Sequence, residues 1–294
     1  MELIEVKKLS KSIHGKEILK DISFEISQGD CVALIGPNGA GKTTLMDCLL
    51  GDKFLTSGQA SVRGLKPTDE QLQQMVAILP QENTVVADLK VNELLNFFQS
   101  IYPNSLSNQE VDILLKFTDK QKEQLASKLS GGQKRLLSFV LALIGRPKIL
   151  FLDEPTSAMD TSTRQHFWEV VDELKKNGVT IVYSSHYIEE VEHTADRILV
   201  LHQGKLIRDT TPYAMRHEEK EKQVTLPSSF VSIVHGLEDI YEVTEKRDVI
   251  SFMTKDIEKV WQSLEEAGCG ISDIEIQNKT LLDSLFDSTR EDKA

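Results

Sequence analysis

Apolar and polar positions along the first 210 residues follow two alternating patterns. Short β-branched runs are separated by longer segments in which apolar residues recur at helical spacing. This order is typical of an α/β domain with a largely parallel sheet that is covered on both faces. The expected strands span residues 32–35, 75–79, 149–152, 180–183 and 198–201.

Two helical regions stand out between these strands. Apolar residues at helical spacing predict a helix between Thr161 and Gly178, with Asp160 or Thr161 as its cap and Gly178 at its end. The pattern over residues 91–145 is wholly helical. We therefore expect a helical insertion, over about residues 83–145, that interrupts the sheet domain.

The balance of charge changes near Thr210, where we place a domain boundary. Most of the acidic excess lies beyond this residue, and the charged segment 217–222 is interpreted as a linker or an exposed helix end. The remaining pattern predicts a small α+β appendage over residues 211–294, with a helix over 257–267. Its expected strands span residues 223–225, 240–243, 249–253 and 271–276.

The overall charge and the cysteine content indicate which ligands the composition disfavours and which cellular compartment suits the protein. Lys and Arg number 34 against 46 for Asp and Glu, so the net charge is −12. An acidic chain does not gather a phosphate backbone by charge alone, which disfavours nucleic acid as a partner. The three cysteines, Cys31, Cys48 and Cys269, are too few and too scattered for a disulfide framework or a zinc site. A reducing cytosol fits this composition.

The chain shows neither a secretion signal nor a membrane span in its sequence. The N-terminal segment places acids before bases and has no apolar core of a signal peptide. The most apolar stretch, residues 136–144, is far shorter than the roughly 20 residues that a spanning helix needs. We therefore expect the chain itself not to cross a membrane.

A phosphate-binding loop follows the first predicted strand of the sheet. The motif G-x-x-x-x-G-K-[ST] stands here between a strand and a helix, as nucleotide binding requires. Its glycines let backbone N–H groups face a polyphosphate, the lysine reaches the β- and γ-phosphates, and the hydroxyl of Thr43 binds Mg²⁺. The residues are Gly36, Pro37, Asn38, Gly39, Ala40, Gly41, Lys42, Thr43 and Thr44.

Two acids end the apolar strand over residues 149–152. Doubly wound sheets hold their ligands at the carboxyl ends of the strands, and Asp153 and Glu154 follow this strand directly. Asp153 is placed to hold Mg²⁺, and Glu154 is suited to polarise an attacking water. Two acids after a strand are often only a solvated helix cap, but the phosphate loop upstream favours the catalytic interpretation.

Four shorter motifs accompany the phosphate loop and the acidic strand. They are Gln81 in LPQE, the segment Leu129-Ser130-Gly131-Gly132-Gln133, the segment Ser157-Ala158-Met159-Asp160, and His186 after two serines. Together with the phosphate loop and the acidic strand, these motifs make six elements whose types and order along the chain resemble the ATP-binding cassette (ABC) family, in which LSGGQ is called the signature. The resemblance covers residues 1–210 and implies a P-loop ABC nucleotide-binding domain with a helical insertion.

The signature segment also has a physical interpretation of its own. Ser130, Gly131 and Gly132 precede a helix predicted over residues 133–144, so they form a helix N-terminus that can bind an anion. The resemblance implies that this segment, with Gln133, covers the ATP held by the phosphate loop of a second copy. Two ATP molecules are then buried in a head-to-tail homodimer that closes on ATP and opens after hydrolysis.

The resemblance also implies roles for four residues outside the phosphate loop. Gln81 ligates Mg²⁺ and senses the partner, Asp160 contacts the opposing phosphate loop, and His186 bonds the γ-phosphate. His186 in addition positions the water that Glu154 polarises. The implied activity is therefore ATP hydrolysis, with ATP as ligand, Mg²⁺ as metal, and Lys42 among the catalytic residues.

One departure from the family concerns adenine. Members usually carry an aromatic residue near the N-terminus that stacks on the base, and Ile13 occupies that position here. An aliphatic contact from Ile13, or stacking by His14, is the expected substitute, with weaker discrimination among nucleotides.

The resemblance implies an integral membrane permease as partner and a cytoplasmic location at the inner face of the membrane. Residues 82, 83, 85, 86 and 91–101 are the candidate contacts. The segment 280–286, TLLDSLF, loosely resembles the end of ATPases from bacterial multi-subunit exporters, which favours export. A soluble ATPase with a regulatory or immunity role, without a permease, is the alternative.

Overall fold

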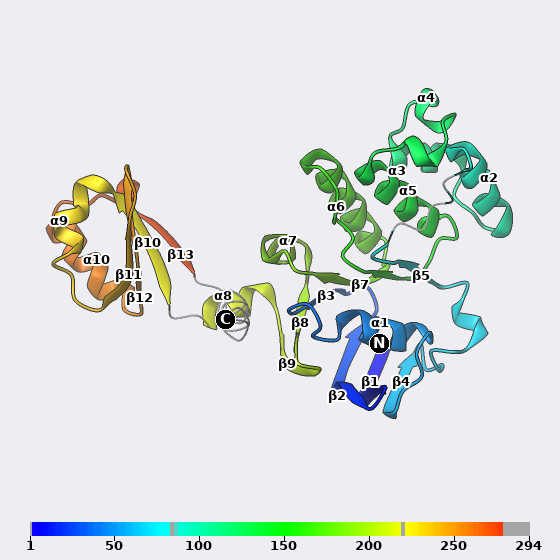
Figure 1. The fold of residues 1–294 in the computed structure, drawn as a ribbon, viewed down its shortest axis with the longest axis horizontal. Coiled ribbons are helices and arrows are strands. Elements are labelled where there is room, and N and C mark those ends of the chain that lie inside the picture. The colour runs from blue at the N-terminus through cyan, green and yellow to red at the C-terminus, as the bar shows by residue number, and fades with distance from the viewer. Residues whose placement is uncertain (1, 83–85, 87, 219–220, 279–294) are drawn as a thin grey trace. The chain divides into compact units, whose positions relative to one another are not determined.

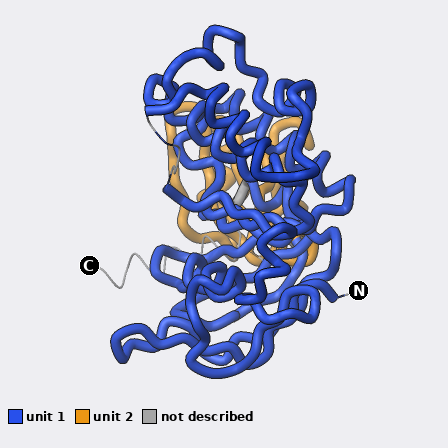
Figure 2. The backbone as a smooth tube through the Cα atoms, turned by 90° about the vertical axis from the view of Figure 1, so that its right-hand side faces the viewer, with its two compact units in different colours: residues 1–211 blue, residues 212–294 orange. Residues whose placement is uncertain are grey.

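The computed structural model describes residues 2–82, 86, 88–218 and 221–278. The chain divides into two compact units, residues 1–211 and residues 212–294 (Figure 2). We call them unit 1 and unit 2. The expected exporter-like segment 280–286 and the candidate contacts Asn83 and Val85 lie outside the described residues.

A six-stranded sheet forms the centre of unit 1 (Figure 1). Its order is β5-β6-β7-β3-β8-β9, and all neighbours are parallel except β8 and β9. The predicted, largely parallel sheet is thus confirmed, with an antiparallel strand added at one edge. The strands are β3 (Cys31–Ile35), β5 (Val76–Leu79), β6 (Ile149–Leu152), β7 (Thr180–Ser185), β8 (Arg197–His202) and β9 (Lys205–Thr210).

A second, antiparallel sheet was not predicted from the sequence. It consists of β1 (Glu2–Ile13), β2 (Lys16–Ser27) and β4 (Ser57–Val62) in the order β2-β1-β4. Register shifts interrupt the pairing of β1 with both neighbours. These irregularities break the strict alternation of apolar and polar residues that identifies a strand in a sequence.

The main core of unit 1 lies between the two sheets and surrounds α1 (Lys42–Leu50). Leu9 and Ile22 of the antiparallel sheet, Leu45 of α1, and Leu34 and Phe151 of the central sheet are all fully buried there. Burial of large apolar side chains on both faces of α1 fixes the helix between the layers. The phosphate loop, directly before α1, is therefore attached to the best-packed part of the chain.

Helices α5 (Gly131–Leu143) and α6 (Thr161–Lys176) cover the other face of the central sheet (Figure 1). The rings of Phe139 and Phe167 join the two helices at 4.4 Å, and Trp168 contacts Tyr183 of β7 at 5.0 Å. The predicted helix after residue 160 is confirmed, with Asp160 as its N-cap. A shorter helix, α7 (Ile188–Thr194), follows β7.

The helical insertion contains α2 (Val91–Ile101), α3 (Asn108–Leu115), the short α4 (Asp119–Lys122) and α5. Two 3₁₀ turns also lie in unit 1, η1 (Glu70–Leu72) and η2 (Ala126–Lys128). The predicted start of the signature helix at Gln133 is wrong. The helix begins at Gly131, because Ser130 Oγ accepts a hydrogen bond from the Gln133 N–H at 3.2 Å and so caps it two residues earlier.

Unit 2 begins with α8 (Pro212–Glu218) and then has a β-α-β-β-α-β order. The strands pair antiparallel in the order β11-β12-β10-β13, the topology of a ferredoxin-like split β-α-β sheet. The elements are β10 (Lys222–Pro227), η3 (Ser228–Phe230), α9 (Val231–Val234), β11 (Ile240–Glu245), β12 (Val249–Thr254), α10 (Ile257–Glu266), η4 (Ile271–Asp273) and β13 (Glu275–Asn278).

One predicted strand of unit 2 is partly wrong. Residues 271–273 form the 3₁₀ turn η4, and the strand begins only at Glu275. The Gly270 N–H donates to Asp273 Oδ2 at 3.0 Å, a local bond that favours a turn over an extended strand. The unit has its own core, in which Val224 and Phe252 of the sheet are packed with Val260 and Leu264 of α10.

A capping ion pair in the helical insertion gives the stability of unit 1 a predicted pH dependence. Hydrogen bonds from the Ser107 backbone and the Arg146 guanidinium lower the pKa of Glu110 to about 2. Because the pKa of Glu110 is lower in the folded protein than in the unfolded chain, the ionised carboxylate stabilises the fold at pH values above 4.5. That stabilisation is lost as the pH falls from 4.5 toward 2. Glu110→Gln should therefore have a lower Tm than the wild type at pH 7. The difference in Tm between the two proteins should become smaller as the pH falls from 4.5 toward 2.

Thermal unfolding between pH 7 and pH 2.5 measures this gap. Asp52→Asn is the matched control, since it neutralises an exposed carboxylate elsewhere in unit 1. A gap for Glu110→Gln that stays constant with pH would contradict the assignment.

Candidate nucleotide-hydrolysis site

The phosphate loop joins β3 to α1 through three glycines with positive φ. Gly36, Gly39 and Gly41 have φ values of 152°, 82° and 106°. A Cβ at Gly36 would lie 2.1 Å from the carbonyl oxygen of Leu201, and one at Gly41 would lie 2.6 Å from Leu19 Cδ2. At Gly36 a backbone carbonyl of a neighbouring strand excludes a side chain, whereas at Gly41 the end of the Leu19 side chain would have to move. The positive φ favours glycine at all three positions.

Lys42 is buried at the first position of α1. Its Nζ donates to the carbonyl oxygens of Gly36 at 2.7 Å and Pro37 at 3.3 Å. Burial lowers the pKa of this ammonium, while the negative charges of Glu154 and Asp153 oppose that change. The lysine therefore lies along the inside of the phosphate loop with two carboxylates close enough to influence its charge.

Asp153 connects the acidic strand end to the phosphate loop. Its Oδ2 accepts a hydrogen bond from Thr43 Oγ1 at 2.8 Å, and its Oδ1 accepts one from Ser184 Oγ at the end of β7. The carboxyl ends of three strands, β3, β6 and β7, thus meet at one point. The sequence motifs named Ser184 only as a neighbour of His186, and its contact with Asp153 depends on the pairing of β6 with β7.

Glu154 lies next to Asp153 with its backbone in the left-handed region, at φ 45°. This conformation costs a non-glycine residue about 1–2 kcal/mol, and it persists only where the surroundings hold it. The Glu154 N–H donates to Ser184 Oγ at 2.8 Å, and its carbonyl accepts from Ser157 Oγ at 2.9 Å. Its carboxylate accepts from Gln81 Nε2 at 3.3 Å and lies 3.5 Å from His186 Nδ1.

The structure therefore brings together six of the residues predicted for this site. Gln81 follows β5, Asp153 and Glu154 follow β6, and His186 follows β7, so neighbouring strands of one sheet deliver their side chains to the same edge. Lys42 and Thr43 reach this edge from the start of α1.

His186 is supported by contacts that the sequence did not indicate. Its ring lies 4.0 Å from that of Tyr187 at an angle of 38°, and the Arg164 guanidinium lies 5.2 Å above the Tyr187 ring. Glu190 of α7 accepts from Thr156 Oγ1 at 2.9 Å and pairs with Arg164 at 3.2 Å. These contacts tie the segment after Glu154 to the segment after His186.

The signature segment lies beside the loop that contains Asp160. A Cβ at Gly132 would approach the carbonyl oxygen of Ala158 at 3.4 Å, and one at Gly131 would approach the Ala158 side chain. Among the described residues, no hydrogen bond or ion pair joins residues 130–133 to residues 36–44. The signature segment thus lies against the loop around Ala158.

Asp160 is the N-cap of α6. Its carboxylate accepts hydrogen bonds from the backbone N–H groups of Ser162 at 3.1 Å and Thr163 at 3.0 Å and from both hydroxyls. These bonds hold the pKa of Asp160 well below its usual range. Ile13, the residue at the expected adenine position, lies at the end of β1 and is half-buried.

Arg135 is the largest buried polar side chain near the site, and the sequence motifs did not include it. It lies on α5, one turn after the signature segment, with 1% of its surface exposed. Burial lowers its pKa to about 10, so the guanidinium stays charged at neutral pH. The only signal in the sequence is an arginine within an apolar helix pattern, which does not reveal its partners.

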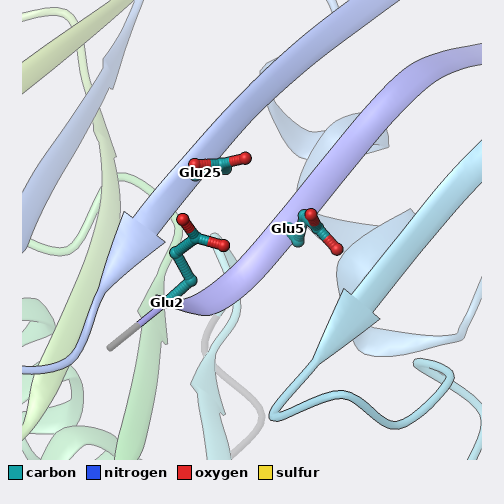
Figure 3. Close-up of side chains that lie close together, drawn as sticks. All are labelled: Glu2, Glu5 and Glu25. Carbon is teal, nitrogen blue, oxygen red and sulfur yellow. The ribbon is translucent and has the colours of Figure 1, made fainter.

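Three glutamates also meet on the exposed antiparallel sheet (Figure 3). The carboxylate oxygens of Glu2, Glu5 and Glu25 lie within 4.8 Å of one another. A hydrogen bond with Glu2 raises the pKa of Glu25, and Lys7 forms an ion pair with Glu5. A raised pKa and a neighbouring ammonium relieve the repulsion, so the cluster is accounted for without a ligand.

Comparison with known proteins identifies the class of this site. A family model described as ABC transporter matches residues 19–157. The Linearmycin resistance ATP-binding protein LnrL of Bacillus subtilis (strain 168) is 34% identical over 212 residues, which cover 70% of this chain and 68% of that protein. Nod factor export ATP-binding protein I of Mesorhizobium japonicum is 34% identical over 222 residues, 74% of this chain and 65% of that protein.

Solved structures agree with this match. A structure titled as the ATP binding subunit of an ABC transporter has a TM-score of 0.66 at 27% identity and covers 74% of this chain and 92% of that chain. A dimeric ATP-binding cassette bound to ADP and phosphate, with a TM-score of 0.64, covers 71% of this chain and 99% of its own. At 22% identity, it shows the fold alone.

The chain belongs to the ABC transporter family. It has the P-loop ABC ATPase fold, and it is an ATP-binding subunit and an ATPase, as the resemblance in the sequence implied. The chain spans about two thirds of the length of the two curated relatives named above. None of the helices in the described ranges has the length and apolar character that crossing a membrane requires.

The clash at Gly36 predicts the effect of adding a single methyl group to the phosphate loop. Gly36→Ala should weaken ATP binding by about ten-fold or more, because about 1.4 kcal/mol of loop strain corresponds to that factor. Gly39→Ala is the matched control, since its φ is also positive but nothing lies within 4 Å of the new Cβ. Equilibrium titration with a fluorescent ATP analogue compares the two, and equal affinities would contradict the steric explanation.

Proposed function

We propose that this chain binds and hydrolyses ATP to power export through a separate membrane permease, by closing and opening a head-to-tail homodimer. The observation that carries the proposal is the convergence of Lys42, Thr43, Asp153, Glu154 and His186 at one sheet edge. The signature segment, by contrast, lies beside the loop around Ala158. A site that lacks its own signature segment is completed by a second copy.

The residues of the sheet edge divide the hydrolytic work. Backbone N–H groups of residues 38–44 and the N-terminus of α1 surround the phosphates, and Lys42 balances their negative charge. Glu154 is the base that accepts a proton from the attacking water. His186, 3.5 Å from Glu154, contacts the γ-phosphate and keeps the water in line. Asp160 contacts the phosphate loop of the partner.

The oxygen atoms at the strand ends fit a magnesium ion. Thr43 Oγ1 and Asp153 Oδ2 lie 2.8 Å apart at the mouth of the phosphate loop, and hydroxyl and carboxylate oxygens are the ligands that Mg²⁺ prefers. Thr43, Asp153 and Gln81 would hold the ion with the phosphates. The ion would supply neutralisation of the charge that develops on the transferred phosphoryl group.

Export and a permease partner are supported by relatives and by one surface. The names of the two relatives described above include resistance and export. Val86, Phe97 and Ile101 expose 54%, 58% and 52% of their surfaces near the Gln81 segment and along α2. Apolar side chains that remain exposed together suit contact with a helical partner. The chain would then act at the cytoplasmic face of the membrane.

The first test concerns Glu154. Glu154→Gln should lower kcat by about a hundred-fold or more, the typical contribution of a general base, and leave ATP affinity within about two-fold. The variant should also accumulate as an ATP-bound dimer, measured by size-exclusion chromatography with light scattering. A kcat near that of the wild type would remove Glu154 from its role.

The second copy is tested in the same background. Adding Ser130→Arg to Glu154→Gln should prevent the dimer, because a long cation replaces the cap that faces the partner's ATP, and should spare ATP binding by the monomer. An ATP-dependent dimer that persists in the double variant would contradict the head-to-tail arrangement.

The permease is tested by purification of the tagged full chain from detergent-solubilised native membranes. A polytopic membrane protein should co-purify with the wild-type chain. Its loss when Phe97 and Ile101 are both replaced by Ser would support the transporter role. Ile113→Ser, at an apolar residue of α3 that is 69% exposed, is the control. Recovery of only soluble, ATP-hydrolysing protein would favour a regulatory or immunity role instead.

A further inference from the structure

The Arg135 guanidinium is saturated by backbone carbonyl groups. Its Nε donates to the Pro155 carbonyl at 2.9 Å, and one terminal nitrogen donates to the carbonyls of Asp153 at 2.7 Å and Glu154 at 3.2 Å. The other terminal nitrogen donates to the carbonyl of Gln81 at 3.2 Å and to that of Pro80. The five contacts equal the five N–H donors of a guanidinium.

The acceptors lie in the loops that follow two neighbouring strands. Residues 80–81 follow β5, residues 153–155 follow β6, and the two strands pair in parallel with Leu79 opposite Leu152. Parallel strands leave carbonyl groups without partners where their ends diverge, and a buried carbonyl without a donor is costly. Among the described residues, no carboxylate forms an ion pair with Arg135. Its partners are therefore the backbones of the two loops.

We propose that Arg135 is a positioning residue that fixes the backbone of Glu154 and links it to the signature segment at the start of α5. The inference rests on the proposed role of Glu154 in hydrolysis. Glu154 has a left-handed backbone, and its carbonyl is one of the five acceptors. Gln81, whose amide contacts the Glu154 carboxylate, contributes a second acceptor.

A single capped turn of α5 connects Arg135 to the signature segment. Arg135 lies one helical turn after Gly131, and Ser130 and Gln133 cap that turn in both directions. A displacement of this helix end, where a second copy's ATP would bind, therefore moves the donors that hold Glu154 and Gln81. Arg135 thus couples the completion of the partner's site to the geometry of its own chain's catalytic carboxylate.

The number of donors decides what a substitution should do. Lysine has three N–H donors on a single nitrogen, so Arg135→Lys keeps the charge but leaves at least two of the five carbonyls unsatisfied. We expect kcat to fall by about ten- to a hundred-fold, since a misplacement of about 1 Å has an effect of that size. ATP affinity should change by less than about two-fold, because no phosphate-loop group contacts Arg135 in the described structure.

Three measurements separate positioning from general stability: kcat, ATP affinity and Tm. Arg146→Lys is the matched control, since it changes a half-exposed arginine that follows α5 and pairs with Glu110 of the helical insertion at 2.7 Å. It should leave kcat unchanged. In Arg135→Ala, millimolar guanidinium chloride should restore kcat several-fold by occupying the vacated space, and Arg146→Ala should show no such response.

The results distinguish this inference from the proposed function. A wild-type kcat for Glu154→Gln would remove the role on which the inference rests. An inactive Glu154→Gln together with a wild-type kcat for Arg135→Lys would overturn the inference alone. Joint loss of kcat, ATP affinity and Tm in both Arg135 variants, without rescue by guanidinium, would assign Arg135 a purely structural role.

Discussion

The parallel pairing of β3, β6 and β7 is the constraint on which the rest of unit 1 depends. Parallel strands bring their carboxyl ends to one edge of the sheet, and each of these three is followed by a functional segment. Asp153 shows the result, because it accepts hydrogen bonds from Thr43 after β3 and Ser184 at the end of β7. A change in strand order would separate these groups although the sequence motifs remained intact.

The layers around the sheet preserve this edge. On one face α1 is enclosed between two sheets, and on the other Phe139 and Phe167 join α5 to α6. Dense packing on both faces lets the edge keep backbone conformations that are unfavourable in isolation, such as the left-handed Glu154. The strained backbone of Glu154 lies at the sheet edge where the proposed chemistry takes place, and the packed core on both faces of the sheet maintains its conformation.

Unit 2 has a sheet and a hydrophobic core of its own. Its antiparallel sheet is covered by helices on one face, and its core is separate from that of unit 1. The ferredoxin-like order of its elements was recognisable only once the strand pairing was known, because the sequence pattern gives strands without their neighbours.

The sequence by itself determined the chemistry of the site. The phosphate loop and the acidic strand end have fixed spacings, because both bind through backbone and side-chain groups that are adjacent in the chain. The sequence also determined the central strands, since buried parallel strands are continuous apolar runs. It missed β1, β2 and β4, whose pairing is irregular.

Only the tertiary structure decided which distant residues support the proposed catalytic groups. Arg135 contacts carbonyls that lie 18 to 55 positions away in the chain, and Ser184 contacts Asp153 across 31 positions. A backbone carbonyl carries no signature in the sequence, because every residue has one. The partners of Arg135 therefore became visible only when the fold placed two strand ends around it.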